Sequence, residues 1–295
     1  AEELAFPILT YGKQEPVHFE DILLQLKQAI SFEAHLQAIE AQLTDFIHQR
    51  QRYSEKELQQ LFMHNQSVTS YRIVYLLPER AKGSFSHWLS LLKNFHHPTA
   101  FAQGIKYQEG IFIILGHTTK APHQPLTIEN VLHQVGIVAT TFRIGCSRDF
   151  TRVSQMKQAL NEALTSATFA QLFRQSISHY TQLGIYQLLL PFVDEPTFVE
   201  YSQQLLTKIQ AADPSKKQKL TETARVFVQE EGDVKRMAGK LRIHENSVRY
   251  RLQKLSEIVN GSQASDHLTH FSLYEQLSIA FRVEELLQKM DALPD

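Results

Sequence analysis

The feature that most constrains this chain is a pair of short amphipathic helices joined by a tight turn, within residues 232–259. Asp233 is suited to cap the first helix, because its carboxylate accepts hydrogen bonds from the backbone amides one turn on. Arg242-Ile243 forms the turn, and His244 begins the second helix. Apolar residues recur at three- and four-residue spacing in both helices, which places them on one face. They are Val234, Ala238 and Leu241, then Val248, Leu252, Leu255 and Val259. Because the small Ala238 allows two steeply crossing helices to approach closely, the pattern predicts a helix-turn-helix.

The second helix carries side chains that bind nucleic acids on the face opposite its apolar stripe. Arginine pairs with guanine, asparagine and glutamine pair with adenine, and serine and tyrosine bind phosphate. Residues 233–254 include seven basic and two acidic side chains, a local net charge of +5 in a chain whose formal net charge is −1. The predicted contact residues are His244, Asn246, Ser247, Arg249, Tyr250, Arg251, Gln253 and Lys254. The pattern predicts binding to double-stranded DNA. The alternative is a solvated amphipathic helix pair.

The sequence of residues 243–252 is Ile-His-Glu-Asn-Ser-Val-Arg-Tyr-Arg-Leu. It resembles the C-terminal helix-turn-helix of the PucR/CdaR family of bacterial transcriptional regulators, whose pattern is close to I-H-R-N-T-[LV]-R-Y-R-L. The resemblance continues through residues 220–224 and 273–287. This chain departs from the pattern at Glu245, where the family usually has a basic residue, and at Ser247. A carboxylate suits the start of a helix but repels a phosphate, so the family's sequence preference is not carried over at this edge.

The middle of the chain alternates short strands and helices around a hairpin turn at residues 107–110. Strands are predicted at residues 71–77, 99–106, 111–116 and 141–146, and helices at 84–95, 128–138 and 153–168. This order predicts an antiparallel-centred sheet covered by helices. It resembles the GGDEF-like domain that precedes the helix-turn-helix in CdaR and many PucR-family proteins. The resemblance is carried by Ile144-Gly145-Cys146-Ser147 and by residues 155–167 and 180–184.

The predicted middle domain lacks the acidic residues of diguanylate cyclases. Its hairpin reads Ile-Lys-Tyr-Gln-Glu-Gly-Ile at residues 105–111, and residues 71–77 contain no carboxylate. Two-metal phosphoryl transfer needs several carboxylates, which Glu109 alone cannot supply. We therefore expect no enzymatic activity and a role as scaffold, dimerisation module or small-molecule sensor. One alternative is a nucleotide-binding or enzymatic signalling protein that uses this domain. Another is an interaction protein whose helix-turn-helix no longer binds DNA.

A homodimer is expected, because one helix-turn-helix contacts only about half a turn of the major groove. Helical apolar periodicity covers most of residues 19–62, and one stripe has no partner within its own segment. This stripe consists of Leu36, Ile39, Leu43 and Phe46. It is predicted either to form the dimer contact, which we favour, or to cover the sheet of the middle domain.

Composition excludes several other classes of protein. Cys146 is the only cysteine, which rules out an internal disulfide and a multi-cysteine zinc site. His96-His97, His117 and His123 lack ligand spacing, so neither a metal nor a cofactor is expected. No apolar run is long enough to span a membrane and no signal peptide is visible, which favours a cytoplasmic protein.

The predicted fold class is α+β, in three parts. N-terminal helices occupy residues 1–66, and a degenerate GGDEF-like α/β sandwich occupies residues 67–190. An all-helical helix-turn-helix domain occupies residues 191–295. A small-molecule effector or a partner is expected to control DNA binding.

Overall fold

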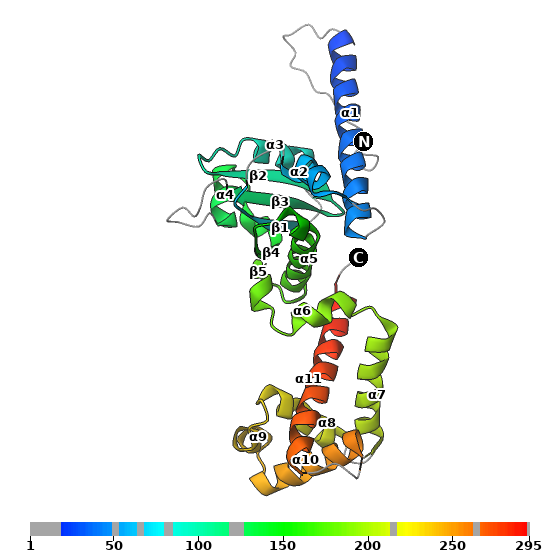
Figure 1. Cartoon of the computed structure of the whole chain (residues 1–295). Coiled ribbons are helices and arrows are strands. Elements are labelled where there is room, and N and C mark those ends of the chain that lie inside the picture. Colours follow the sequence, from blue (N-terminus) through cyan, green and yellow to red (C-terminus); the bar gives the residue numbers. More distant parts are fainter. Residues whose placement is uncertain are drawn as a thin grey trace. The chain divides into compact units, whose positions relative to one another are not determined.

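The computed structural model describes residues 19–48, 53–63, 68–79, 85–117, 127–212, 217–261 and 266–293. Contacts divide the chain into two compact units, Ala1–Gly184 and Ile185–Asp295. The first contains a five-stranded sheet with helices, and the elements described in the second are all helical (Figure 1). The predicted α+β class is therefore confirmed. The division into three parts stays a prediction, as does the GGDEF-like assignment of the sheet domain.

The sheet of the first unit has the strand order β2-β3-β1-β4-β5. The strands are β1 (Ser70–Pro78), β2 (Ala100–Tyr107), β3 (Gly110–His117), β4 (Phe142–Phe150) and β5 (Ile177–His179). The first four pair antiparallel, and β5 lies parallel to β4. The antiparallel-centred sheet follows the sequence prediction, and the three-residue strand β5 was not predicted.

Helices bury both faces of this sheet. They are α2 (Glu55–Met63), α3 (Phe85–Lys93), α4 (Ile128–Gln134) and α5 (Met156–Leu172). The short 3₁₀ helices are η1 (Ala139–Thr141), η2 (Val153–Gln155) and η3 (Tyr180–Gln182). Along β1, alternate side chains point to opposite faces: Tyr71, Ile73 and Tyr75 pack with α5, whereas Val74 and Leu76 pack with α3 and α4. The core is thus two apolar layers divided by the sheet.

A long helix, α1 (Phe19–Ile47), covers the edge strand β2. Its Leu36 is buried with the α3 and α4 layer, and its Leu43 is buried with the α5 layer. The Glu40 carboxylate accepts hydrogen bonds from Lys106 Nζ and from the backbone N–H of Gln108, each at 2.6 Å. The apolar stripe of residues 36–46 therefore packs on the sheet of its own chain. Our preference for this stripe as the dimer contact is wrong, and the alternative of covering the sheet is right.

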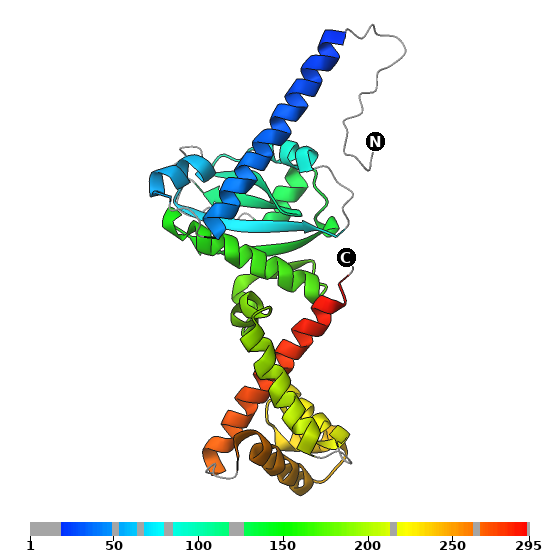
Figure 2. The same ribbon diagram turned by 90° about the vertical axis from the view of Figure 1, so that its right-hand side faces the viewer.

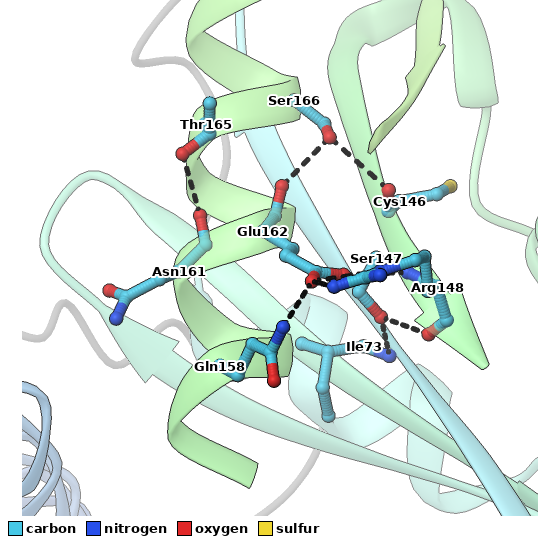
Figure 3. Close-up of polar contacts among 9 residues, drawn as sticks. All are labelled: Ile73, Cys146, Ser147, Arg148, Gln158, Asn161, Glu162, Thr165 and Ser166. Atoms are coloured by element: carbon cyan, nitrogen blue, oxygen red, sulfur yellow. Dashed lines mark hydrogen bonds and ion pairs between the residues drawn. The ribbon is translucent and has the colours of Figure 1, made fainter. Parts of the chain in front are cut away.

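A buried carboxylate ties β4 to α5 (Figure 3). Glu162 is 3% exposed, and its carboxylate accepts from the backbone N–H of Arg148 at 3.0 Å and from Nη2 of the same residue at 2.5 Å. Gln158 donates a further hydrogen bond at 3.1 Å. Next to this contact, the Ser147 hydroxyl accepts from the backbone N–H of Ile73 at 2.9 Å, where the β1–β4 register shifts. The hydroxyl satisfies a buried amide at this irregularity.

Replacing Arg148 with methionine is expected to destabilise the first unit by about 2 kcal/mol, because the buried Glu162 carboxylate loses its counter-charge. Unfolding of this unit is measured in urea through the fluorescence of Trp88, the only tryptophan, which packs on Phe142. Adding Glu162→Gln to Arg148→Met should restore part of the lost stability, since the amide carries no charge. A double variant that is no more stable than Arg148→Met would contradict this explanation.

The second unit is a bundle of helices around one apolar cluster. Two short elements come first, α6 (Tyr186–Leu189) and η4 (Leu190–Phe192). The bundle helices are α7 (Pro196–Ala212), α8 (Lys217–Gln229), α9 (Val234–Leu241), α10 (Glu245–Asn260) and α11 (Asp266–Asp291). Figure 1 shows α10 at the end of this unit, next to one end of α11. The helix α11 contains residues 273–287, through which the family resemblance continues, and no strand lies among the described residues of this unit.

Two further observations concern the described residues of the whole chain. They contain no group of three or more His, Cys, Asp or Glu side chains placed to hold a metal ion, and His123 lies outside them. None of their helices has the length and apolar character needed to span a membrane. Cys146 is buried in β4, and burial raises the pKa of its thiol to about 12.

Candidate DNA-binding site

The helix-turn-helix begins with the predicted cap. The Asp233 carboxylate accepts from the backbone N–H groups of Lys235 and Arg236 at 2.9 and 3.0 Å. These bonds, the one to Arg236 first, lower the pKa of Asp233. At the other end of α9, Arg242 has the left-handed φ of 54°, and the N–H of Ile243 reaches the Ala238 carbonyl at 3.1 Å. This C-terminal cap turns the chain sharply into α10.

His244 caps α10, since its Nδ1 accepts from the backbone N–H of Asn246 at 3.2 Å. Val248, Leu252 and Leu255 of α10 are fully buried against α7, α8 and α11. This packing fixes the rotation of α10 about its axis, so its polar face points to solvent. The predicted apolar stripe is therefore confirmed. In α9 the fully buried residue is Met237, which the prediction omitted.

On one flank of the exposed α10 face, polar side chains contact acidic residues of the same helix. Arg249 Nη2 lies 3.2 Å from Glu245 Oε2, and Nη1 lies 3.5 Å from Asn246 Oδ1. One turn further along, Gln253 donates to Glu257 Oε1 at 3.3 Å. Glu245, where the sequence departs from the family pattern, is thus the ion-pair partner of Arg249. An acidic side chain thus contacts each of two predicted contact residues, Arg249 and Gln253.

The other flank of α10 borders a hollow of about 390 Å³ against the start of α8. Five of the eight predicted contact residues line it: Asn246, Ser247, Tyr250, Arg251 and Lys254. Two residues of α8, Lys219 and Leu220, complete the lining. Tyr250 is 59% exposed, and Lys254 Nζ lies 5.0 Å from the centre of its ring. The structure thus gathers most of the predicted residues on one flank and leaves Arg249 and Gln253 on the other.

Arg251 is the predicted residue that faces the bundle most. Its side chain is half-buried, and Nη1 donates to the Thr223 hydroxyl of α8 at 3.2 Å. Thr223 is fully buried and donates in turn to the backbone carbonyl of Lys219 at 2.5 Å. This chain of hydrogen bonds connects α10 to the first turns of α8. Lys219 lies in the first turn of α8, which begins at Lys217.

The charge of α9 is lower at its surface than the predicted count suggests. Glu230 lies 2.8 Å from Lys240 Nζ and 3.9 Å from Arg236 Nε, and Asp233 lies 3.2 Å from Arg236. Because the sequence window began at residue 233, it left out Glu230 and Glu231, which also lies 3.9 Å from Arg236. Arg236 and Lys240 of α9 are thus both ion-paired with acidic residues that precede the helix.

Comparison with known families identifies the C-terminal helices. Residues 220–279 match the PucR C-terminal helix-turn-helix domain. The chain is 26% identical over 145 residues to the proline-responsive transcriptional activator PutR of Bacillus subtilis, covering 48% of this chain and 35% of that protein. It is 22% identical over 221 residues to the DNA-binding transcriptional activator AdeR of the same organism, covering 75% of this chain and 45% of that protein. The chain thus spans less than half the length of either of these curated relatives.

Among solved structures, the chain is similar to a regulator of polyketide synthase expression from Bifidobacterium adolescentis. The identity is 18%, the TM-score is 0.33, and the alignment covers 74% of this chain and 82% of that one. The family match spans α8 to most of α11, which are the elements that position α10. The C-terminal unit of the chain thus contains a domain that matches the PucR-type helix-turn-helix family.

Proposed function

We propose that this protein is a bacterial transcriptional regulator that binds operator DNA through α10 and acts in the cytoplasm. The observation that carries the proposal is the orientation of α10 within a PucR-type domain. Its apolar side is fixed in the bundle, and its polar side presents arginine, asparagine, serine, tyrosine and lysine to solvent. A helix of this kind enters the major groove and contacts base edges and phosphates.

The test is to incubate the full chain with fragmented genomic DNA, recover the bound fragments across a salt titration, and sequence them. Enrichment of a shared motif that survives at higher salt supports the proposal. Binding without enrichment would indicate non-specific attraction, and no binding at low salt would refute the proposal.

The alternative of an enzymatic or nucleotide-binding signalling protein is not favoured. The β2–β3 hairpin, where a diguanylate cyclase places its acidic signature, is held by Glu40 of α1 through Lys106 and Gln108. We predict that the purified chain makes no cyclic dinucleotide from GTP and Mg²⁺, measured by chromatography of the products. Formation of a cyclic dinucleotide would contradict this prediction and support the enzymatic alternative. We propose instead that the first unit responds to a small molecule or partner.

We also propose that the functional species is a homodimer. The N-terminal half of α1 extends past the sheet (Figures 1 and 2). Within it, Leu23 and Ile30 are 49% and 66% exposed, and they lie seven residues apart on one side of the helix. These residues, and not the buried Leu36 and Leu43, are the proposed contact. A symmetric pair would present two copies of α10 to two half-sites.

We predict that the full chain has twice the mass of one chain in light scattering at micromolar concentration, and that Leu23→Lys with Ile30→Lys makes it monomeric. The added charges would have to be buried without partners in the dimer. Val138→Lys is the matched control, because Val138 is 61% exposed and belongs to the segment before η1, outside α1. A wild-type monomer would rule out the dimer, and a dimeric double variant would place the contact elsewhere.

A further inference from the structure

The hollow between α8 and α10 collects positive charge. Lys219, Arg251 and Lys254 line it from two helices. No carboxylate belongs to the lining that the structure describes, although Glu245 accompanies Arg249 on the opposite flank. A group that enters the hollow therefore meets three cations, which favours an anion over a base edge or an apolar ligand.

The neutral groups of the hollow are also suited to an oxyanion. Ser247 and Tyr250 carry hydroxyl donors, and Asn246 carries an amide donor. Lys219 and Leu220 lie near the N-terminus of α8, which begins at Lys217. The backbone amides of a first helical turn carry partial positive charge and attract phosphate. Charge, donors and helix polarity thus favour the same class of ligand.

Thr223 connects the two helices that line the hollow. Its buried hydroxyl accepts from Arg251 Nη1 and donates to the carbonyl of Lys219. One hydroxyl thereby fixes a cationic side chain of α10 and the backbone of the α8 residue opposite it. The bond uses one of the five guanidinium N–H donors of Arg251. A fixed arginine loses less side-chain freedom when it binds an anion.

We propose that this hollow binds one phosphate of the DNA backbone, and that Thr223 is a positioning residue for it. The inference rests on the proposed function. A recognition helix in the major groove lies between two phosphate backbones, and contacts to these phosphates set its register without reading sequence. The hollow gives α10 such an anchor on its α8 side, and the flank of Arg249 is directed to the base pairs.

The first test uses the full chain, a mixed-sequence duplex of about two helical turns and fluorescence anisotropy between about 50 and 200 mM KCl. Lys219→Gln combined with Lys254→Gln should lower the slope of log affinity against log salt by about 0.9, and weaken binding about fivefold to tenfold near 0.1 M salt. Adding Arg251→Gln should lower the slope no further, since the same phosphate contact is already lost. Lys208→Gln is the matched control, because Lys208 is exposed on α7 and does not line the hollow.

The second test addresses Thr223. Thr223→Val keeps a similar volume and removes the hydroxyl, so duplex affinity should fall with a slope change in the same direction as for Lys219→Gln. Thr223→Ser should restore both, since it returns the hydroxyl. The thermal unfolding midpoint of each variant is measured alongside. If Thr223→Val lowers the midpoint but leaves the salt slope at its wild-type value, the residue has a structural role only and the positioning role is refuted.

The other possible results of these experiments also decide for or against the inference. An unchanged slope in the lysine double variant would overturn the inference while leaving DNA binding intact. A loss of about 0.9 for each residue removed would indicate separate phosphates and also overturn it. Inorganic phosphate that releases the duplex more than KCl at equal ionic strength, in the wild type but not in Lys219→Gln, would support the inference, because free phosphate and the DNA backbone would then compete for the hollow. A wild-type chain that binds no duplex would refute the proposed function itself.

Discussion

Replacing Gly145 with alanine is expected to destabilise the first unit by about 3 kcal/mol or more, because the new methyl group would overlap the backbone of α5. A Cβ at this position would lie 2.2 Å from the Ala163 carbonyl oxygen and from the Ala167 nitrogen. Both contacts are to backbone atoms, which no side-chain rotation relieves. Either α5 moves away from β4 or the strand bends, and both changes open the buried layer between them.

The measurement is urea unfolding followed by Trp88 fluorescence, which reports on the first unit. Gly104→Ala is the matched control in the same sheet, because its Cβ would meet only side-chain ends, Leu92 Cδ1 at 2.7 Å and Leu89 Cδ2 at 2.8 Å. These leucines can change rotamer, so the loss should be about 1 kcal/mol. Equal losses for the two variants would show that the α5 backbone is not the obstacle. A Gly145→Ala chain with no folded first unit would support the prediction.

Replacing Arg249 with alanine is expected to lower operator affinity by about 1–3 kcal/mol and to relax preference at one base pair. Arg249 lies on the exposed face of α10, where a guanidinium reaches the edge of guanine. Its ion pair with Glu245 orients the side chain in the free protein, and one hydrogen bond to Asn246 supports it. Binding a base would replace these contacts with a bidentate pair.

Affinity is measured by anisotropy on the selected motif and on duplexes with single base-pair changes. Lys254→Ala is the comparison, since a phosphate contact should weaken all these duplexes alike. Glu245→Gln should raise affinity for mixed-sequence DNA, because it removes a negative charge next to the backbone and frees Arg249. If neither Arg249→Ala nor Lys254→Ala alters affinity, α10 is not the recognition helix.

The features that could be predicted are those set by residues close together in the chain. The Asp233 carboxylate binds the backbone N–H groups two and three residues later. The buried residues of α10 recur every three or four positions. The β2–β3 hairpin was predicted from residues 107–110, which form its turn. The partners of α1 could not be predicted, because Glu40 binds groups 66 and 68 residues later, at the end of β2 and in the hairpin turn, which sequence periodicity does not place next to α1.

In the candidate site too, features set by neighbouring residues could be predicted and contacts between distant residues could not. The eight predicted residues lie at the start of α10 and along it, but periodicity alone could not divide them between two flanks. Lys219 joins them only because α8 packs against α10, and Arg251 points toward Thr223, which lies 28 residues earlier. The balancing role of Glu230 was missed because the charge was counted from residue 233 onward.

The contact between α1 and the β2–β3 hairpin has a consequence for synthesis of the chain. The helix leaves the ribosome long before the strand that it covers, since Glu40 precedes Gln108 by 68 residues. At about 5–20 residues per second, this interval lasts on the order of ten seconds. During it, Leu36 and Leu43 have no sheet to cover, so the nascent chain exposes an apolar helix. We expect this interval to be when the protein depends most on chaperones.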